Sequence, residues 1–176
     1  MLKGILISGT GGQGILAAGE FLSEALFKAG YEVVNSRSYG SEARGGSCRS
    51  QVLVSDEEIY DLSLGEADIL VVLSAPAFSR YQGRAKAGGL VLVDSEVIEK
   101  HEGEIRDDVE LVQVRAGETA LGLGNPIVAN MVLLGALAKR SGLITLDDLK
   151  EAVKTGMRAS MQEINFRALD AGYAAA

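Results

Sequence analysis

Residues that could carry acid–base, thiol or metal chemistry are scarce in this chain of 176 residues. It contains one cysteine, one histidine, two prolines and no tryptophan. A single cysteine cannot close an intramolecular disulfide, and the chain has no Cys-x-x-Cys pair to hold zinc or an iron–sulfur cluster. His101 is in the polar segment 99–103, so we interpret it as a solvated loop residue rather than a general base. The sequence therefore predicts no catalytic residue and no metal ligand.

Positive charge and long apolar runs are also in short supply. There are 17 lysines and arginines against 24 aspartates and glutamates, for a net charge of −7. This balance argues against a general nucleic-acid or anionic-membrane surface. The first apolar stretch, residues 5–7, runs into a glycine turn, so we interpret it as neither a signal peptide nor a membrane span. We expect a cytoplasmic protein with no nucleic-acid or membrane partner.

Glycine, in contrast, is abundant, and its most informative cluster follows that first apolar stretch. Apolar residues at helical spacing come after it, which predicts a strand, a glycine turn and a helix. This geometry presents backbone N–H groups at a helix N-terminus and suits phosphate or another anion. The alternative is that the glycines only let the helix pack on the strand. The candidate contacts are Gly9, Gly11, Gly12, Gln13 and Gly14.

The spacing Gly9-x-Gly11-x-x-Gly14 also fits a dinucleotide fingerprint, which requires an acid at the end of the second strand. That strand is predicted over residues 31–38, and its only acid, Glu32, lies at its start. This position disfavours NAD. Arg37 could face a 2′-phosphate, so an NADP- or nucleotide-binding Rossmann-like protein acting alone stays open as the alternative function.

A second glycine-rich loop follows that strand. Glycines permit close approach of a partner, and Arg44 and Arg49 offer planar, multi-donor contacts to phosphate or carboxylate. In a doubly wound sheet, loops after the first two strands can flank the crevice where ligands bind. The alternative is a surface loop whose charges have no partner. The candidate residues here are Tyr39, Glu42, Arg44, Gly45 and Gly46.

Strand and helix signals alternate along the rest of the chain. The alternation, with no proline-rich linker, predicts a single α/β domain over residues 1–176. Its expected architecture is a doubly wound, mostly parallel sheet with helices on both faces, a Rossmann-like three-layer fold. Gly88-Gly89 is expected to form a turn, and Thr145 with Asp148 a capping box. The predicted strands are 4–8, 31–38, 48–55, 69–73, 90–94 and 111–114, and the predicted helices are 12–29, 76–87, 126–141, 146–159 and 163–173.

Three motifs taken together are more specific than any one of them. The runs Gly9–Gly14, Ser38–Gly46 and Asn130–Gly135 resemble, in order and spacing, the gamma subunit of 2-oxoacid:ferredoxin oxidoreductases. The resemblance extends from the first strand to about Leu149 and is closest to the 2-oxoglutarate branch, although the pyruvate, 2-oxoisovalerate and indolepyruvate branches share these motifs. Ser41 stands where a proline is common in the family. Asn130 joins the candidate site through this resemblance.

The resemblance implies a subunit rather than a complete enzyme. Complexes of this family decarboxylate a 2-oxoacid on thiamine diphosphate, send electrons through iron–sulfur clusters to ferredoxin and pass the acyl group to coenzyme A. Thiamine diphosphate lies between the alpha and beta subunits, and clusters are on beta or on a ferredoxin-like delta chain. The gamma domain caps the assembly near the coenzyme A side. We therefore expect these subunits as partners and no cofactor bound by this chain alone; a homodimer of the isolated chain and a pure scaffold role stay open.

Overall fold

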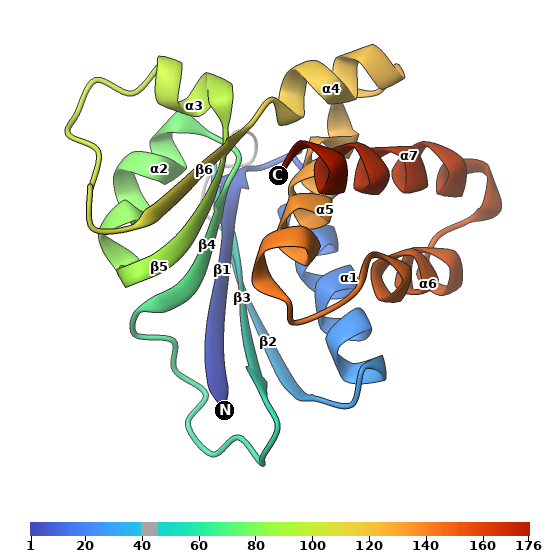
Figure 1. Ribbon diagram of the computed structural model, residues 1–176, viewed down its shortest axis with the longest axis horizontal. Helices are drawn as coiled ribbons and strands as arrows, with labels where there is room; N and C mark the ends of the chain where they lie inside the picture. Colours follow the sequence, from blue (N-terminus) through green and yellow to red (C-terminus); the bar gives the residue numbers. More distant parts are fainter. Residues whose placement is uncertain (40–45) are drawn as a thin grey trace.

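Six strands form one sheet in the order β2-β3-β1-β4-β5-β6 in the computed structural model, which describes residues 1–39 and 46–176 (Figure 1). β3 runs antiparallel to both of its neighbours, whereas β1, β4, β5 and β6 pair in parallel. The predicted mostly parallel sheet is thus confirmed, with one reversed strand inserted between β1 and β2. The strands are β1 (Leu2–Thr10), β2 (Glu32–Tyr39), β3 (Ser47–Ser55), β4 (Ala67–Val72), β5 (Ala85–Asp94) and β6 (Glu110–Val114).

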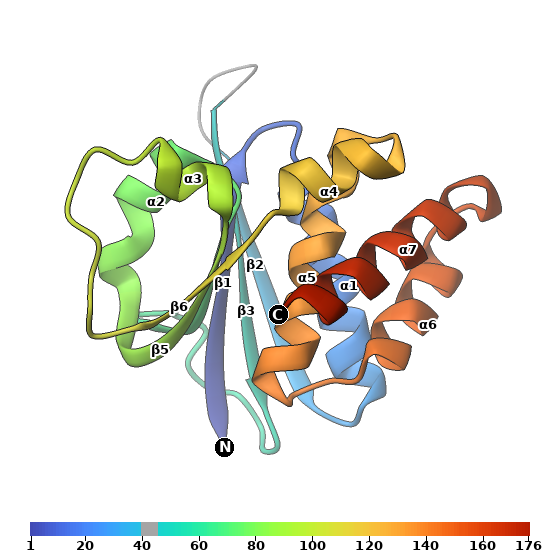
Figure 2. The ribbon, with the colours of Figure 1, turned by 45° about the horizontal axis from the view of Figure 1, so that its top comes forward.

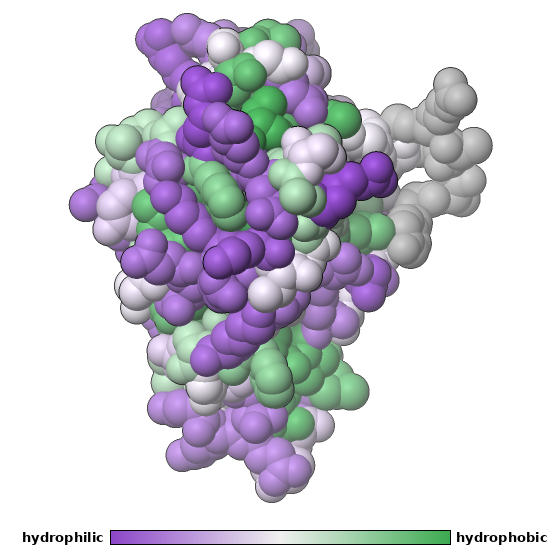
Figure 3. All heavy atoms as spheres, turned by 90° about the vertical axis from the view of Figure 1, so that its right-hand side faces the viewer, coloured by the Kyte–Doolittle hydropathy of each residue, from purple (hydrophilic) through white to green (hydrophobic). Residues whose placement is uncertain are grey.

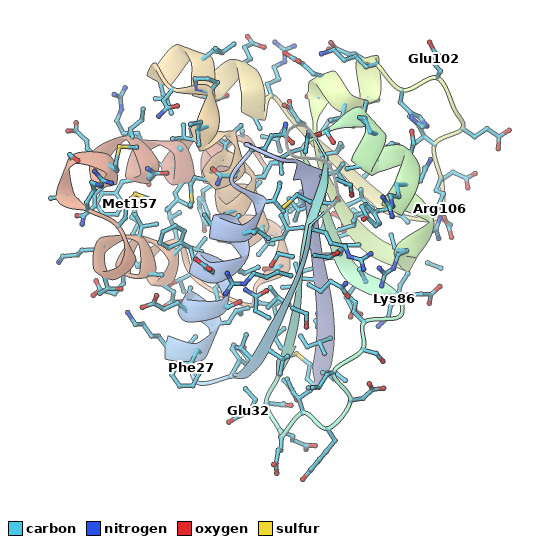
Figure 4. The ribbon with its side chains drawn as sticks, turned by 180° about the vertical axis from the view of Figure 1, so that it is seen from behind. Phe27, Glu32, Lys86, Glu102, Arg106 and Met157 are labelled. Carbon is cyan, nitrogen blue, oxygen red and sulfur yellow. The ribbon has the colours of Figure 1, made fainter. Side chains whose placement is uncertain are left out.

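Helices cover both faces of the sheet, so the predicted three-layer arrangement is also confirmed (Figure 2). One face carries α2 (Ala75–Tyr81) and α3 (Ser95–Glu99). The other face carries the larger group: α1 (Ile15–Lys28), α4 (Ala116–Leu123), α5 (Ala129–Ser141), α6 (Leu146–Gly156) and α7 (Ala159–Ala175). Figure 4, from behind, shows α1 ending near Phe27 on one side of the strands and Lys86 and Arg106 on the other.

The two faces correspond to two apolar clusters that share the central strands. Ile5 and Ile7 point into the cluster that contains the buried residues of α1 and α5, whereas Leu6 points into the cluster of α2 with Phe78. All three strand residues are fully buried. The continuous apolar runs of β1 and β4 therefore reflect strands covered on both faces.

The helix α5 is enclosed by its neighbours along most of its length. Residues 129–138 are all buried, and the helix packs closely against α7. A Cβ on Gly135 would overlap the carbonyl oxygen of Leu169, and one on Gly172 would overlap that of Val132. Gly135, the last residue of the third motif, thus serves helix packing.

The sequence prediction was wrong between α2 and β5. The helix ends at Tyr81, and β5 already begins at Ala85, so Gly88-Gly89 lies inside a strand instead of forming a turn. Arg106 donates hydrogen bonds to the carbonyl oxygens of Gln82 and Ala85 at the start of this strand. Gly88 has φ +73° and lies at an irregularity where the register between β4 and β5 shifts. The first helix is also shorter than predicted, and the short helices α3 and α4 were not predicted.

One local prediction is confirmed at the surface helices. The capping box forms at the start of α6, where Asp148 N donates to Thr145 Oγ1 at 3.1 Å and Thr145 N donates to Asp148 Oδ2 at 2.8 Å. The face formed by α6 and α7 is covered largely by hydrophilic side chains (Figure 3). Among the helices of the described residues, none is both long and apolar enough to cross a membrane.

Candidate functional site

The glycine-rich turn lies at the carboxyl edge of the sheet, between β1 and α1. Gly12 has φ +92° and Gly14 has φ +71°, a left-handed backbone conformation that favours glycine. Gly14 is the N-cap residue of α1, and Gly11 and Gly12 are exposed. The predicted strand–glycine–helix unit is therefore present, with its turn open to the surface.

The side chain of Gln13 fixes the shape of this turn. Its Oε1 accepts a hydrogen bond from Thr10 N at 2.8 Å, and its Nε2 donates to the carbonyl oxygen of Leu73 at 3.0 Å, just after β4. A Cβ on Gly9 would come within 2.5 Å of Gln13 Oε1. Gly9 thus leaves space for the Gln13 amide, and both residues shape the loop.

Asn130 joins the first motif to the third. Its Nδ2 donates to the carbonyl oxygen of Gly14 at 3.0 Å, and its Oδ1 accepts from Met131 N at 2.8 Å. The residue is 5% exposed. A Cβ on Gly14 would lie 2.5 Å from Asn130 Nδ2, so the close approach requires glycine. In this arrangement Asn130 positions the start of α1.

Some backbone amides of the turn donate hydrogen bonds within the described part of the chain, and others do not. Gly11 N donates to the carbonyl oxygen of Gly46 at 2.8 Å, and Gln13 N donates to that of Thr10 at 3.2 Å. Among the described residues, the amides of Gly12 and Gly14 have no hydrogen-bond acceptor. The first amides of a helix also lack intrahelical partners and carry the positive end of its dipole. The turn can therefore hold an anion through backbone groups.

The two predicted loops meet, although β3 separates β1 from β2 in the sheet. The contact is the Gly11–Gly46 hydrogen bond. Tyr39 ends β2, where its backbone pairs with Cys48. The other second-loop candidates, Glu42, Arg44 and Gly45, lie outside the described residues.

Arg37, on which the NADP interpretation depends, is engaged elsewhere. Its guanidinium Nη1 lies 2.5 Å from Glu20 Oε1 of α1. The dinucleotide fingerprint also requires the second strand to lie beside β1, but here β3 lies between β1 and β2. The alternative function thus loses its supporting geometry.

A cleft of about 410 Å³ adjoins the turn, above the carboxyl ends of β4 and β5. Asp94, the last residue of β5, is 8% exposed and was not predicted as a site residue. Its Oδ2 accepts from Gly117 N at 3.2 Å, while Oδ1 has no partner among the described residues. Burial raises the pKa of the Asp94 carboxyl above its ordinary value. The sequence signal that could have identified Asp94 was its position, as an acid directly after the apolar run Leu90–Val93. The cleft residues include Gln13, Leu73, Pro76, Asp94, Gly117 and Leu121.

The remaining candidates for side-chain chemistry lie in structural settings. Cys48 is buried in the main apolar cluster, and burial raises the pKa of its thiol, which disfavours the reactive thiolate. His101 is half-buried: its ring packs edge-to-face on Phe78, with centroids 4.9 Å apart. The predicted loop position of His101 is confirmed, and the packing on Phe78 covers part of its ring. Within the described ranges, no group of three His, Cys, Asp or Glu side chains could hold a metal ion.

These features define an α/β protein that presents the backbone amides of a glycine turn, beside the buried carboxyl of Asp94, at the carboxyl edge of its sheet. A family model described as pyruvate ferredoxin/flavodoxin oxidoreductase matches residues 4–175. The chain belongs to this family.

Individual relatives agree with this assignment. The chain is 40% identical over 179 residues to the 2-oxoglutarate synthase subunit KorC of Methanothermobacter marburgensis, which covers 98% of this chain and 95% of the relative. The structure of the keto/oxoacid ferredoxin oxidoreductase gamma subunit of Geobacter sulfurreducens matches with a TM-score of 0.83 at 33% identity. The match covers 98% of this chain and 96% of the other. The 2-oxoglutarate:ferredoxin oxidoreductase of Magnetococcus marinus, solved with 2-oxoglutarate, coenzyme A and succinyl-CoA bound, has a TM-score of 0.83 at 27% identity. That match covers 98% of this chain but 30% of the other.

Proposed function

We propose that this chain is the gamma subunit of a coenzyme-A-dependent 2-oxoacid:ferredoxin oxidoreductase, with 2-oxoglutarate as the substrate of the complex. The observation that carries the proposal is the 40% identity to a 2-oxoglutarate synthase subunit along nearly the whole of both chains. The local geometry agrees, because the turn offers backbone donors and the chain's few reactive side chains are buried or packed. The expected location is the cytoplasm.

The glycine turn is the proposed contact for the phosphate-bearing end of coenzyme A. The amides of Gly12 and Gly14, which have no acceptor among the described residues, and the first turn of α1 fit a phosphate. Such a helix end stabilises an anion by roughly 0.3–2 kcal/mol. Gln13 and Asn130 hold the turn in place. When bound, coenzyme A supplies the thiol that accepts the acyl group. This chain contributes binding and orientation of the coenzyme.

The remaining chemistry belongs to the partner subunits. Thiamine diphosphate between alpha and beta, and iron–sulfur clusters on beta or on a ferredoxin-like delta chain, supply decarboxylation and electron transfer to ferredoxin. The second loop, with Tyr39, Glu42, Arg44, Gly45 and Gly46, is proposed to face coenzyme A or these partners. Its support is the hydrogen bond that places Gly46 against the turn.

The test is an activity assay of the chain with and without its partners. An affinity-tagged chain is purified from its native cells under mild conditions, and the same chain is expressed alone. Each preparation is assayed with 2-oxoglutarate, coenzyme A and an artificial electron acceptor. We expect turnover and bound iron only in the preparation that contains partner subunits. Turnover or bound iron with the isolated chain, or native purification without a thiamine-diphosphate subunit, would contradict the proposal.

A further inference from the structure

Two arginines converge on one buried tyrosine where β3 meets the end of α2. The guanidinium carbon of Arg49 lies 5.8 Å from the ring centre of Tyr81, and that of Arg80 lies 5.5 Å from it. Tyr81 is 3% exposed, and its hydroxyl lies 3.3 Å from Ser47 Oγ. Cation–π contacts of this kind hold the guanidiniums in place but leave them positively charged.

Neither positive charge is neutralised by the described part of the chain. Its ion pairs involve Arg37, Arg106, Arg115 and Arg140, but not Arg49 or Arg80. Arg49 Nε is buried without a hydrogen-bond partner among the described residues. An unsatisfied buried donor requires an explanation, since most such groups in folded proteins are paired. In a chain of net charge −7, a local pair of cations with no ion-pair partner among the described residues favours an acidic partner.

The cluster lies on the β2–β3 side of the sheet. Ser50 and Val52 of β3 are buried toward α1, so strand alternation turns Arg49 and Gln51 to the opposite face. On that face α2 packs against β1 and β4, whereas β2 and β3 receive their main helix contact from α1 on the other side. The views in Figures 2 and 4 agree with this division. Ser36 of the edge strand β2 is exposed there. We call the strip formed by Ser36, Arg49, Gln51 and Arg80 the arginine face.

A charged strip of this kind suits a protein partner better than a small ligand. Neither arginine lines the cleft beside Gln13. In the Magnetococcus relative the matching part makes up 30% of a longer chain, so this fold occurs there joined to further protein. Some of its surface must therefore face other parts of that enzyme.

We infer that the arginine face docks an acidic segment of a partner subunit, with carboxylates paired to the guanidiniums of Arg49 and Arg80. The planar guanidinium fork matches a carboxylate in two parallel hydrogen bonds, and it also stacks on aromatic rings as seen at Tyr81. The identity of the partner rests on the proposed function, whereas the surface and its chemistry rest on the contacts described above.

The test measures the affinity between this chain and the partner subassembly that carries thiamine diphosphate, expressed without this chain and purified. The variant Arg49→Gln/Arg80→Gln removes both charges. We expect its Kd to rise about tenfold or more, and the wild-type Kd to rise more steeply with added salt than that of the variant. Arg37→Gln is the matched control, because Arg37 lies on the opposite face of β2 and pairs with Glu20. Its Kd should stay within about twofold of the wild-type value.

Circular dichroism and thermal melting report whether the double variant folds. If it does not, Arg49→Lys/Arg80→Lys keeps the charges but loses the fork, and its Kd should also rise. An unchanged Kd in a folded variant would overturn the inference and leave the arginines as a cover for Tyr81. Loss of self-association alone would assign the face to a second copy, and a raised KM for coenzyme A with unchanged assembly would assign it to a phosphate; either result overturns the inference. Failure of the wild-type chain to bind any partner would overturn the proposed function as well.

Discussion

The side-chain amide of Asn130 donates a hydrogen bond to the carbonyl oxygen of Gly14, a residue 116 positions earlier in the chain. The same carbonyl accepts the first backbone hydrogen bond of α1, from Ala18 N at 3.0 Å. One buried side chain on α5 thereby fixes the start of α1 and the glycine turn before it. This contact gives a physical reason for the first and third motifs to occur together.

Replacing Asn130 tests how strongly this contact holds the turn. Asn130→Asp keeps the size of the side chain and the acceptor for Met131 N but puts a carboxylate oxygen against the carbonyl of Gly14. We expect the free energy of unfolding at neutral pH to fall by about 1–3 kcal/mol, measured by urea denaturation. Asn125→Asp is the control, since Asn125 acts as an acceptor for Ile127 N near the surface and keeps that role as Asp. Equal stability of Asn130→Asp and wild type would show that the Gly14 contact contributes nothing.

The buried carboxyl of Asp94 predicts a pH dependence of stability. Burial raises its pKa in the folded chain above the ordinary value of 3.8 and outweighs the backbone hydrogen bonds from Glu96 and Gly117, which lower it. Ionisation therefore opposes folding: the contribution of Asp94 is most favourable below the ordinary value and is lost as the pH rises through the raised pKa. We expect the stability of wild type relative to Asp94→Asn to fall over this window and then to level off.

Urea denaturation of both proteins at several values between about pH 2 and about pH 8 measures this difference. Asp61→Asn is a control of opposite sign, because hydrogen bonds from Ser63 lower the pKa of the exposed Asp61 carboxyl. The stabilisation from Asp61 is present above its ordinary value and is lost as the pH falls through the lowered pKa. If the difference in stability between wild type and Asp94→Asn stays constant across the range, the pKa of the Asp94 carboxyl is not raised by folding, and the prediction is wrong.

The sequence predicted those parts of the fold that depend on local pattern. The apolar runs around Ile5–Ile7 and Val71 identified strands buried on both faces, and Thr145 with Asp148 identified the start of α6. The position of β3 between β1 and β2 was not predicted, because it depends on pairing between distant residues such as Gly9 and Cys48. Helix α4 was missed for a similar reason. It contains Gly117 and Gly122, and the acid that accepts from its first turn is Asp94, 23 residues earlier.

In the candidate site, too, the sequence predicted local features but not contacts between distant residues. Sequence reasoning placed Gln13 and Asn130 with the ligand contacts, and their contact with a ligand stays a prediction. The structure engages both side-chain amides with backbone groups, which sequence spacing could not reveal because the partners, Leu73 and Gly14, are brought close only by folding. Among the described residues, the donors left for an anion include the backbone amides of Gly12 and Gly14 and those of the first turn of α1.

Gly12 is the position at which an anion contact is tested most directly. The residue is exposed, has φ +92°, and a Cβ added there meets no heavy atom within 4 Å. Gly12→Asp and Gly12→Asn therefore introduce similar backbone strain without a clash, and they differ mainly in charge. In the assembled enzyme we expect the apparent affinity for coenzyme A to fall about twofold to thirtyfold in Gly12→Asp relative to Gly12→Asn, the range given by the energy of a charge at a helix terminus.

Steady-state kinetics with varied coenzyme A measures this comparison, and decarboxylation of the 2-oxoacid in the absence of coenzyme A reports on the partner subunits. That partial reaction should be similar in both variants, because the added carboxylate repels a phosphate at the turn and leaves the buried strands intact. Thermal melting confirms that the two variants are equally folded, and size-exclusion chromatography confirms that both assemble. If both variants assemble and share one KM for coenzyme A, the glycines serve only the packing of α1 on β1, and the anion site must be sought elsewhere in the complex.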